Sequence, residues 1–381
     1  MAAPAARTGR AAPVLERPVI LFAFNRPDYL LRVCTSLLRQ NGVTVDPRRV
    51  FLVQDGAVSP RTGVRYAEDA AVAASIAAFR EVFPQGQVAA ARANLGVSRN
   101  IRRGEALAFE ALDAEYAYFL EDDLELGPDY LRIMEEMARL AEADPRIGYF
   151  AAYGDHKAEA PGPECYLVPL QHHWAFGLRR EPWRRLRDWL APYDAILEPT
   201  DYTYRDHLAV FRWMESLPVA INFSSQDAVK SLGCAALGIA RVMTDVCFGR
   251  YIGAQGASFR DERFQSMGYD RMAWKEGPDF RLAEGLETQV GAILAHRRDG
   301  YGRYREKKLA PFLANYRKTH FDDDAPLTRE DVDAHYRVFL RRTPEAGDYA
   351  DLVGRQTPKA LRRALLAARE FRGANPVPPV G

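Results

Sequence analysis

The chain has 381 residues, of which 48% are hydrophobic and 27% are charged, and its formal net charge is +1. This length allows one large domain or two ordinary ones, and the near-neutral charge gives no support for nucleic acid or an anionic membrane surface as the main partner. No apolar run reaches the roughly 18 residues that a transmembrane helix needs. The four cysteines are too widely spaced to predict a metal site or a disulfide framework, which favours a reducing compartment. We therefore expect a cytoplasmic protein, with peripheral attachment at the inner face of a membrane as the alternative.

The two ends of the chain have the composition of disordered tails. Residues 1–16 are rich in Ala, Arg and Pro without the apolar core of a secretory signal, and residues 374–381 are rich in Pro. Both segments are predicted to be disordered.

Strand and helix patterns alternate through the first part of the chain, which predicts an α/β fold with a mostly parallel sheet. Continuous apolar runs indicate strands buried on both faces. The expected strands cover residues 18–24, 50–53, 87–91 and 116–120, and the expected helices cover about 28–38, 66–82, 101–112 and 128–143.

The second part of the chain is less regular, and its last third is polar. Expected strands cover 147–152, 166–170 and 239–243, and expected helices cover 181–190, 203–216, 226–237 and 285–295. Two apolar helical faces within 327–372 predict a separate helical module. The predicted division is a domain over 17–325, with a nucleotide-sugar half (17–145) and an acceptor half (146–325), followed by a helical module over 326–373.

Polar residues follow three of the predicted strands at the point where each ends. They are Arg26, Asp55 and the three acids Glu121, Asp122 and Asp123. Right-handed crossovers bring the carboxyl ends of parallel strands to one edge of the sheet, where ligands bind. Taken alone, an acid triplet is more often a solvated turn, but beside a nucleotide site it predicts a divalent cation held with substrate phosphates. The absence of G-x-G-x-x-G and of a Walker lysine argues against a dehydrogenase and a P-loop enzyme.

Several segments together resemble a GT-A nucleotide-sugar glycosyltransferase, and most closely the N-acetylglucosaminyltransferase I type. The resemblance covers about residues 18–260, and its most specific part is the metal motif, which reads EDDLELGPDY here. It departs from the family where an acidic pair reads Gln226-Asp227, in the lack of a membrane anchor, and in the last third of the chain. The other similar segments read PVILFAFNRPDYLLRVCTSLL, VQDG, WAFGLRREPW, SSQDAVKSLG and CFGRYIGAQGASF.

The resemblance implies a role for each matching residue. Asp123 is expected to bind Mn²⁺ or Mg²⁺, and Asp227 to act as the general base, with helix capping as the alternative for Asp227. The donor-binding residues are expected to be Arg26 and Asp55 near the base, Glu121 and Asp122 near the ribose and sugar, and Arg99 and Asn100 from a loop. The alternatives are a surface arginine at a helix start for Arg26, an ordinary Asp-Gly turn for Asp55, and helix capping for Arg99 and Asn100.

Three further residues are candidates for the acceptor site. Trp174 and Phe176 could stack on a sugar ring, although ordinary packing is commoner for buried aromatics, and His173 is either an acceptor-site or a structural residue. Adjacent histidines on a strand point to opposite faces, so His172 and His173 do not easily share one metal ion. Glycines within 249–256 predict a lid over residues 250–260 that orders on donor binding.

Taken together, the sequence predicts an inverting, metal-dependent glycosyltransferase. Its donor would be a UDP-sugar, with GlcNAc or a related hexose as the sugar, and its acceptor a hydroxyl of a glycan or glycoconjugate. The helical module would recruit a protein partner. The alternatives are a non-catalytic carbohydrate- or nucleotide-binding protein and a sugar nucleotidyltransferase, although the latter usually carries a glycine-rich loop after the first strand.

Overall fold

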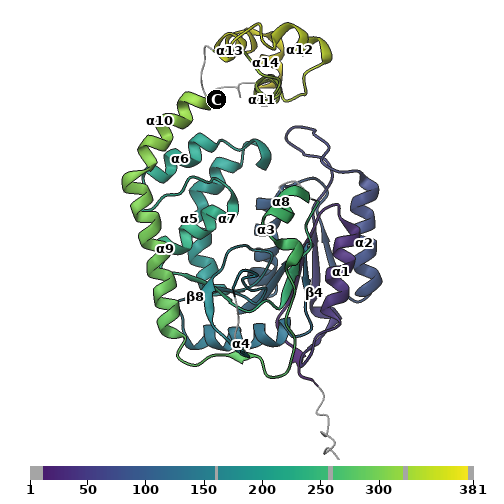
Figure 1. Cartoon of the computed structure of the whole chain (residues 1–381). Coiled ribbons are helices and arrows are strands. Elements are labelled where there is room, and N and C mark those ends of the chain that lie inside the picture. Colours follow the sequence, from purple (N-terminus) through teal and green to yellow (C-terminus); the bar gives the residue numbers. More distant parts are fainter. Residues whose placement is uncertain (1–11, 159–161, 256–260, 321–324, 376–381) are drawn as a thin grey trace, which may run out of the picture.

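The computed structural model describes residues 12–158, 162–255, 261–320 and 325–375. One eight-stranded sheet crosses the larger part of the molecule, with helices packed on both of its faces (Figure 1). In spatial order its strands are β5 (Gln87–Ala90), β4 (Val50–Gln54), β2 (Val19–Ala23), β6 (Tyr116–Glu121), β11 (Ala175–Arg179), β8 (Ile147–Ala151), β12 (Ala240–Thr244) and β10 (Leu167–Pro169).

Most neighbouring strands of this sheet run parallel. The pairs β5–β4, β4–β2, β2–β6 and β8–β12 are parallel, whereas β11 is antiparallel to both of its neighbours and β10 is antiparallel to β12. Every residue of β2, β4 and β8 is buried, as continuous apolar runs between two layers of helices require. The α/β fold of GT-A type with a mostly parallel sheet is therefore confirmed.

Strand β11 is part of the sheet that the sequence did not predict. Its five residues, AFGLR, are interrupted by Gly177, which weakens a strand pattern. A Cβ atom at Gly177 would lie 2.2 Å from a ring carbon of Phe150, so the packing of β11 beside β8 requires glycine there. Gly177 therefore explains both why the sequence pattern did not predict β11 and how β11 packs against β8.

In the first half, α1 (Pro27–Leu37), α2 (Asp69–Val82) and α4 (Tyr130–Ala143) lie close to where they were expected. Helix α3 (Val97–Ala106) begins about four residues before the predicted start, after Gly96 with a φ of 76°. A positive φ of this kind suits glycine. The prediction of a loop around Arg99 and Asn100 was thus wrong, because both residues lie in the first turns of α3. A short π-helical segment, Leu107–Ala111, continues the helix.

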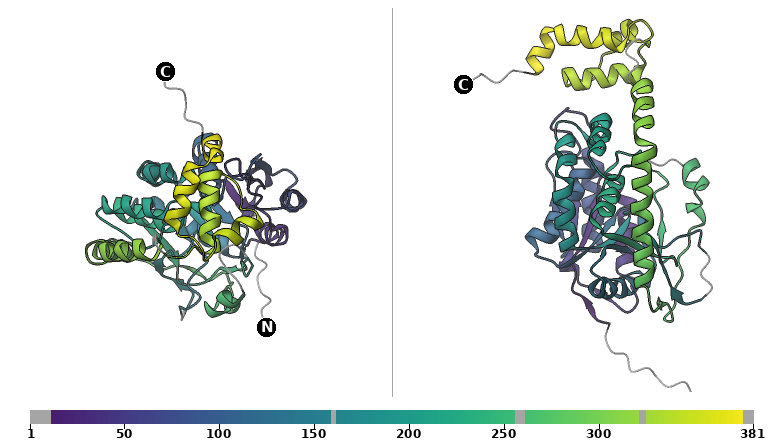
Figure 2. Two further views of the ribbon diagram at one scale, coloured as in Figure 1. Left: turned by 90° about the horizontal axis from the view of Figure 1, so that it is seen from above. Right: turned by 90° about the vertical axis from the view of Figure 1, so that its left-hand side faces the viewer.

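The second half contains α5 (Arg180–Leu197), α6 (His207–Glu215) and α7 (Gln226–Leu237), followed by α9 (Glu287–Lys307) and α10 (Leu309–His320). Helix α9 is longer than the predicted 285–295, and α10 was not predicted. Only Val290 and Ile293 are buried in α9, both in its first half, so the remainder has no apolar stripe to reveal it. Figure 2 shows α9 and α10 running in line toward the C-terminal helices.

Several segments expected to be irregular form short strands or helices. Val14–Leu15 (β1) pairs with Thr44–Val45 (β3), so the ordered chain begins before the predicted end of the tail at residue 16. In the predicted lid, Gly249–Tyr251 (β13) pairs with Leu124–Leu126 (β7), and Asp261–Ser266 (α8) follows. Residues 256–260 of that segment lie outside the described residues. A further short pair joins Glu164–Cys165 (β9) and Arg281–Leu282 (β14).

Four short helices form a bundle at the C-terminal end: α11 (Arg329–Leu340), α12 (Ala346–Leu352), α13 (Pro358–Ala367) and α14 (Arg369–Ala374). Thr328 and Asp331 cap the start of α11 reciprocally. Figures 1 and 2 show this bundle at one end of the molecule, beyond α10. Its core is separate from that of the sheet and consists of Leu327, Val332, Tyr336, Leu340, Leu352, Leu361 and Leu365.

Of the helices in the described part of the chain, none has the length and apolar character needed to cross a membrane.

Candidate active site

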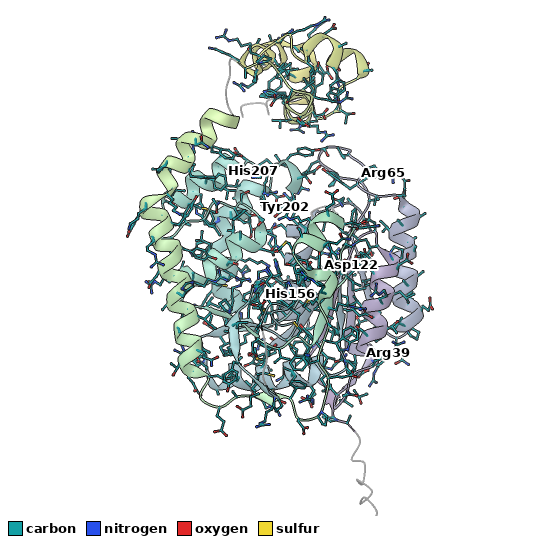
Figure 3. The ribbon with its side chains drawn as sticks, in the orientation of Figure 1. Arg39, Arg65, Asp122, His156, Tyr202 and His207 are labelled. Atoms are coloured by element: carbon teal, nitrogen blue, oxygen red, sulfur yellow. The ribbon has the colours of Figure 1, made fainter. Side chains whose placement is uncertain are left out.

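The sheet brings three of the predicted polar segments to one edge. Ala23 of β2 is in register with Gln54 of β4, and Phe22 is in register with Glu121 of β6. The residues after these strands therefore lie side by side, as the carboxyl ends of parallel strands do. Figure 3 places Asp122 near the centre of the molecule, with Tyr202 above it in this view.

Arg26 lies against the acids that follow β6. Its Nε is 3.2 Å from Oδ2 of Asp122, and its terminal amino group donates to Oδ1 of Asp122 and, at 3.0 Å, to Oδ2 of Asp123. Burial raises the pKa of Asp122 to about 6 and also raises that of Asp123, although Arg26 opposes both shifts. One guanidinium thus offsets only part of the cost of burying two acids.

Asp123 has an unused oxygen. Its side chain is buried, and Oδ1 has no hydrogen-bond partner among the described residues. The chain after β13 passes closely: the backbone N–H of Ile252 donates to the Asp123 carbonyl at 2.8 Å, and a Cβ at Gly253 would lie 2.9 Å from Oδ2. A buried unpaired carboxylate oxygen is costly, and a hard divalent cation is the partner it suits.

Glu121 interacts electrostatically with Asp122, Asp123 and Asp227. Burial, followed by the charges of Asp123, Asp227 and Asp122, raises its pKa well above the ordinary value for glutamate. Its carboxyl group accepts no hydrogen bond from the part of the chain that the structure describes. The four acids therefore form one electrostatically connected group at the sheet edge.

Asp227 is the second residue of α7, after Ser225 at the N-cap. Oδ1 accepts hydrogen bonds from Nδ1 of His173 at 3.0 Å and from Nε2 of Gln226, whereas Oδ2 accepts none from a described residue. The carboxylate makes no capping bond to the described backbone, so capping does not explain its position. Burial opposes ionisation, but His173 and the charges of Lys230 and Arg241 outweigh it and lower the pKa of Asp227.

His173 is almost fully buried, with 3% of its surface exposed, and links Asp227 to β12. Its Nε2 lies 3.1 Å from a terminal nitrogen of Arg241. Burial, together with the charge of Arg241, lowers the pKa of His173 to about 4, although Asp227 acts in the other direction. The imidazole is therefore neutral at neutral pH. Arg241 was not predicted as a site residue, because it lies inside β12 without a motif around it.

Asp55 is buried and forms hydrogen bonds within the protein. Its Oδ1 accepts from the backbone N–H groups of Gly56 at 2.9 Å and Leu95 at 2.7 Å, and its Oδ2 accepts from the Gly96 N–H at 3.0 Å and the Asn94 side chain at 3.3 Å. These four bonds match the acceptor sites of one carboxylate. Asp55 therefore fixes the loop that leads into α3.

Arg99 and Asn100 also bond to neighbouring backbone. Arg99 donates to the carbonyls of Leu197 at 2.7 Å and Glu198 at 2.8 Å, which caps the C-terminus of α5. Asn100 donates from Nδ2 to the Val53 carbonyl at 3.2 Å, and its buried Oδ1 has no partner in the described residues. Both side chains thus join α3 to neighbouring elements.

Trp174 and Phe176 are packed inside the protein. The Trp174 ring stacks on His172 with centroids 4.2 Å apart and on Tyr251 with centroids 4.0 Å apart, and Phe176 stacks on Phe119 at 5.3 Å. Only 6% of Trp174 and 3% of Phe176 are exposed. Their ring faces therefore take part in core packing.

Comparison with known proteins agrees with the chemistry of this edge. Residues 19–192, a little under half of the chain, match the family model described as "Glycosyl transferase family 2". This segment contains the acids after β6 and the residues around them, and it ends before Asp227.

Solved glycosyltransferase structures show a remote likeness. Residues 1–349 of S. aureus TarS align with a TM-score of 0.36 at 14% identity, over 94% of this chain and 90% of that one. A longer S. aureus TarS structure aligns with a TM-score of 0.33 at 12% identity. The alignment covers 94% of this chain but only about 55% of the length of that TarS structure. The galactosyltransferase LgtC, in complex with donor and acceptor sugar analogues, gives a TM-score of 0.28 at 13% identity, over 68% and 97%. Scores this low carry no argument about substrate.

Residues 19–192 therefore match glycosyl transferase family 2, and this match supports glycosyl transfer as the chemistry of the sheet edge.

Proposed function

We propose that this protein is an inverting, metal-dependent glycosyltransferase that moves a hexose or N-acetylhexosamine from a UDP-sugar to a hydroxyl of a glycan or glycoconjugate. The observation that carries the proposal is the state of Asp227. It is ionised, held through one oxygen, and has its other oxygen free of described partners. It also lies close enough to Glu121 for its charge to affect that residue, so base and acid triplet share one site.

The metal would bind at Asp123. The unpartnered, buried Oδ1 and the close approach of glycine at position 253 suit a hard cation with oxygen ligands. Within the described residues no group of three or more His, Cys, Asp or Glu side chains forms a metal site, so the donor phosphates and water would supply the remaining ligands. When bound, Mn²⁺ or Mg²⁺ would supply Lewis-acid stabilisation of the departing diphosphate.

Asp227 would act as the general base. The acceptor hydroxyl would lose its proton to Oδ2 as its oxygen attacks the anomeric carbon from the side opposite the departing UDP. This single displacement inverts the anomeric configuration. Because the pKa of Asp227 is lowered, the carboxylate is available as a base throughout the neutral range.

The remaining polar residues would act on the donor. We propose that Arg26, Glu121 and Asp122 face the nucleotide and sugar. Arg26 would then give up some of its hydrogen bonds to Asp122 and Asp123 and bind the diphosphate instead. Asp55, Arg99 and Asn100 are proposed to support the nucleotide end by fixing the loop and helix that border it. His173, Trp174 and Phe176 would support the acceptor side from the core.

The cellular setting is proposed to be the cytoplasm. All four cysteines are free and buried, as a reducing compartment allows. The C-terminal helices are proposed to bind a protein partner, in line with a bundle that has its own core.

The test is turnover of UDP-sugars by the purified protein. UDP-GlcNAc, UDP-glucose and UDP-galactose are each incubated with Mn²⁺ or with EDTA, and released UDP is measured. We expect slow release from one of them with Mn²⁺ and none with EDTA. Binding of all three without release would instead favour a non-catalytic binding protein. Formation of pyrophosphate from UTP and a sugar 1-phosphate would favour a nucleotidyltransferase.

A further inference from the structure

The proposed base stands at the end of a chain of three side chains, of which His173 and Arg241 are buried and Asp227 is half exposed. A terminal nitrogen of Arg241 lies 3.1 Å from Nε2 of His173, and Nδ1 of His173 lies 3.0 Å from Oδ1 of Asp227. Arg241 comes from β12, His173 precedes β11, and Asp227 begins α7. A second branch closes the ring, because Arg241 also donates to Oγ of Ser231, which donates to the Asp227 carbonyl at 2.8 Å.

The direction of these hydrogen bonds follows from the donor inventory of the side chains. A guanidinium has only donors, so Nε2 of His173 must accept the bond from Arg241. A neutral imidazole that accepts at Nε2 carries its hydrogen on Nδ1. Nδ1 therefore donates to Oδ1 of Asp227, and Arg241 fixes the tautomer that makes this possible.

We propose that His173 is a positioning residue for the base Asp227, and that Arg241 acts through His173 by holding it in the Nδ1–H tautomer. This inference rests on the proposed function. In the reaction, the acceptor oxygen forms its bond to the anomeric carbon, and the bond from that carbon to UDP breaks with its electron pair on the diphosphate. The hydroxyl proton moves to Oδ2 of Asp227. His173 stays neutral and keeps its hydrogen bond to Oδ1 of Asp227, so Oδ2 is held in a fixed orientation.

His173 does not act as a proton acceptor itself. Its Nε2 is occupied by Arg241, and its imidazole is buried, which disfavours the charged form. The titratable and charged groups whose interactions reach Asp227 are Glu121 of β6, Tyr149 of β8, His172 and His173 before β11, Tyr202 near α6, Lys230 of α7 and Arg241 of β12.

Two substitutions of His173 distinguish the roles of its two ring nitrogens. Asparagine places an amide donor where Nδ1 was, whereas glutamine extends to the position of Nε2. His173→Asn should keep transfer within about fivefold of the parent. His173→Gln should lower kcat by about 10- to 100-fold, which is no more than the lower end of the contribution of a general base, because the base itself remains. The acidic limb of the kcat–pH profile of His173→Gln should move to higher pH, because Asp227 loses a donor that favours its ionised form. Affinity for UDP with Mn²⁺ should not change.

A double-substitution cycle distinguishes positioning from a purely structural role. In the Asp227→Asn background, His173→Gln should cause no further loss, because there is no base left to position. Additive losses, or equal losses for His173→Asn and His173→Gln, would overturn the inference. If Asp227→Asn alone transfers as well as the parent, the assignment of the base fails first, so the two failures are distinguishable.

Arg241 offers a second route should His173→Gln not fold. Arg241→Met leaves Nε2 without its donor, so the imidazole can move its hydrogen to Nε2 and lose the bond to Asp227. Transfer should fall by roughly 10-fold, the change that corresponds to an interaction free energy of one pKa unit. Adding His173→Asn should restore it, since an amide donor has no tautomer to fix. Failure of this rescue in a folded double variant would contradict the role given to Arg241.

Discussion

At the scale of single residues, Asp123 is the group on which the proposed metal dependence rests. Asp123→Asn removes the anionic ligand but keeps the size of the side chain, so the fold should survive. We expect the variant to lose the Mn²⁺-dependent increase in Tm that UDP gives the parent. The measurement is a thermal-shift titration of UDP with Mn²⁺ and with EDTA.

Glu125→Gln is the matched control for Asp123→Asn. Glu125 lies two residues further along, but its carboxylate is engaged by Arg32 and by Arg250, each at 2.7 Å. The control should keep the Mn²⁺-dependent shift. An equal shift in parent and Asp123→Asn would show that the cation binds elsewhere.

His173 also makes the stability of the fold depend on pH. Its folded pKa of about 4 lies below the value of about 6.5 expected in the unfolded chain. As the pH falls from 6.5 to 4, the unfolded state gains a proton that the folded state does not, so the contribution of the neutral imidazole is lost over that window. The loss should be on the order of 3 kcal/mol.

The measurement is Tm from pH 8 to pH 4 for the parent and for His173→Asn, which has no titrating group at that position. The parent curve should fall more steeply below pH 6.5. Parallel curves for the two proteins would mean that the pKa of His173 in the folded state is close to that of an exposed histidine. Asp227 does not interfere, because its pKa is lowered and its effect falls at still lower pH.

Individual site residues differ in how far the sequence could reveal them. Asp123 and Asp227 were predicted because motifs surround them, although their roles remain proposals. The bond between His173 and Asp227 joins residues 54 positions apart, and Arg241 has no local signal at all. Such contacts depend on how β11, β12 and α7 meet, and a pattern within one segment does not contain that information.

At the scale of elements, Gly56 fixes the approach of two loops. A Cβ atom there would lie 2.4 Å from the backbone carbonyl carbon of Ala93, and backbone cannot rotate away as a side chain can. Gly56→Ala should therefore destabilise the fold by about 1–3 kcal/mol and weaken UDP binding, because the loop fixed by Asp55 must move. Urea unfolding and UDP titration measure the two effects.

Gly162→Ala is the control, because a Cβ at that glycine meets nothing within 4 Å. It should change stability by no more than about 0.5 kcal/mol. Equal effects at both positions would mean that the close contact with Ala93 is not the cause of the loss at Gly56.

The elements themselves were predictable where one physical rule dominates. β2 and β4 are apolar runs buried on both faces, and α1 repeats its buried residues at helical spacing, so each was found. β11 is interrupted by a glycine that packing requires, and the second half of α9 has no buried face. Those elements depend on their tertiary surroundings more than on their own pattern.

At the scale of the whole molecule, the C-terminal bundle is expected to be dispensable for chemistry. Its core is separate from that of the sheet, and one contact to the rest of the chain is Arg337 over the Tyr204 ring at 4.7 Å. Such a contact is worth about 0.5–1 kcal/mol. Truncation after residue 325 keeps α10 and should leave UDP-sugar hydrolysis within about twofold of the full chain, because little stabilising contact is lost.

The comparison requires that the truncated protein unfolds cooperatively with a Tm close to that of the full chain. A folded truncated protein with a large loss of hydrolysis would place the bundle in the catalytic unit. Loss of transfer to a polymeric acceptor, with hydrolysis retained, would instead agree with a recruiting role.

The most direct test of Asp227 as the general base compares Asp227→Asn with the parent in two assays on the same preparations. One assay measures UDP binding in the presence of Mn²⁺, and the other measures transfer from the UDP-sugar that the parent uses. If Asp227 is the base, binding should stay within a few fold while transfer falls by roughly 100-fold or more. Unchanged transfer would contradict the account, and so would a parallel loss of binding and transfer, which would make Asp227 a structural residue.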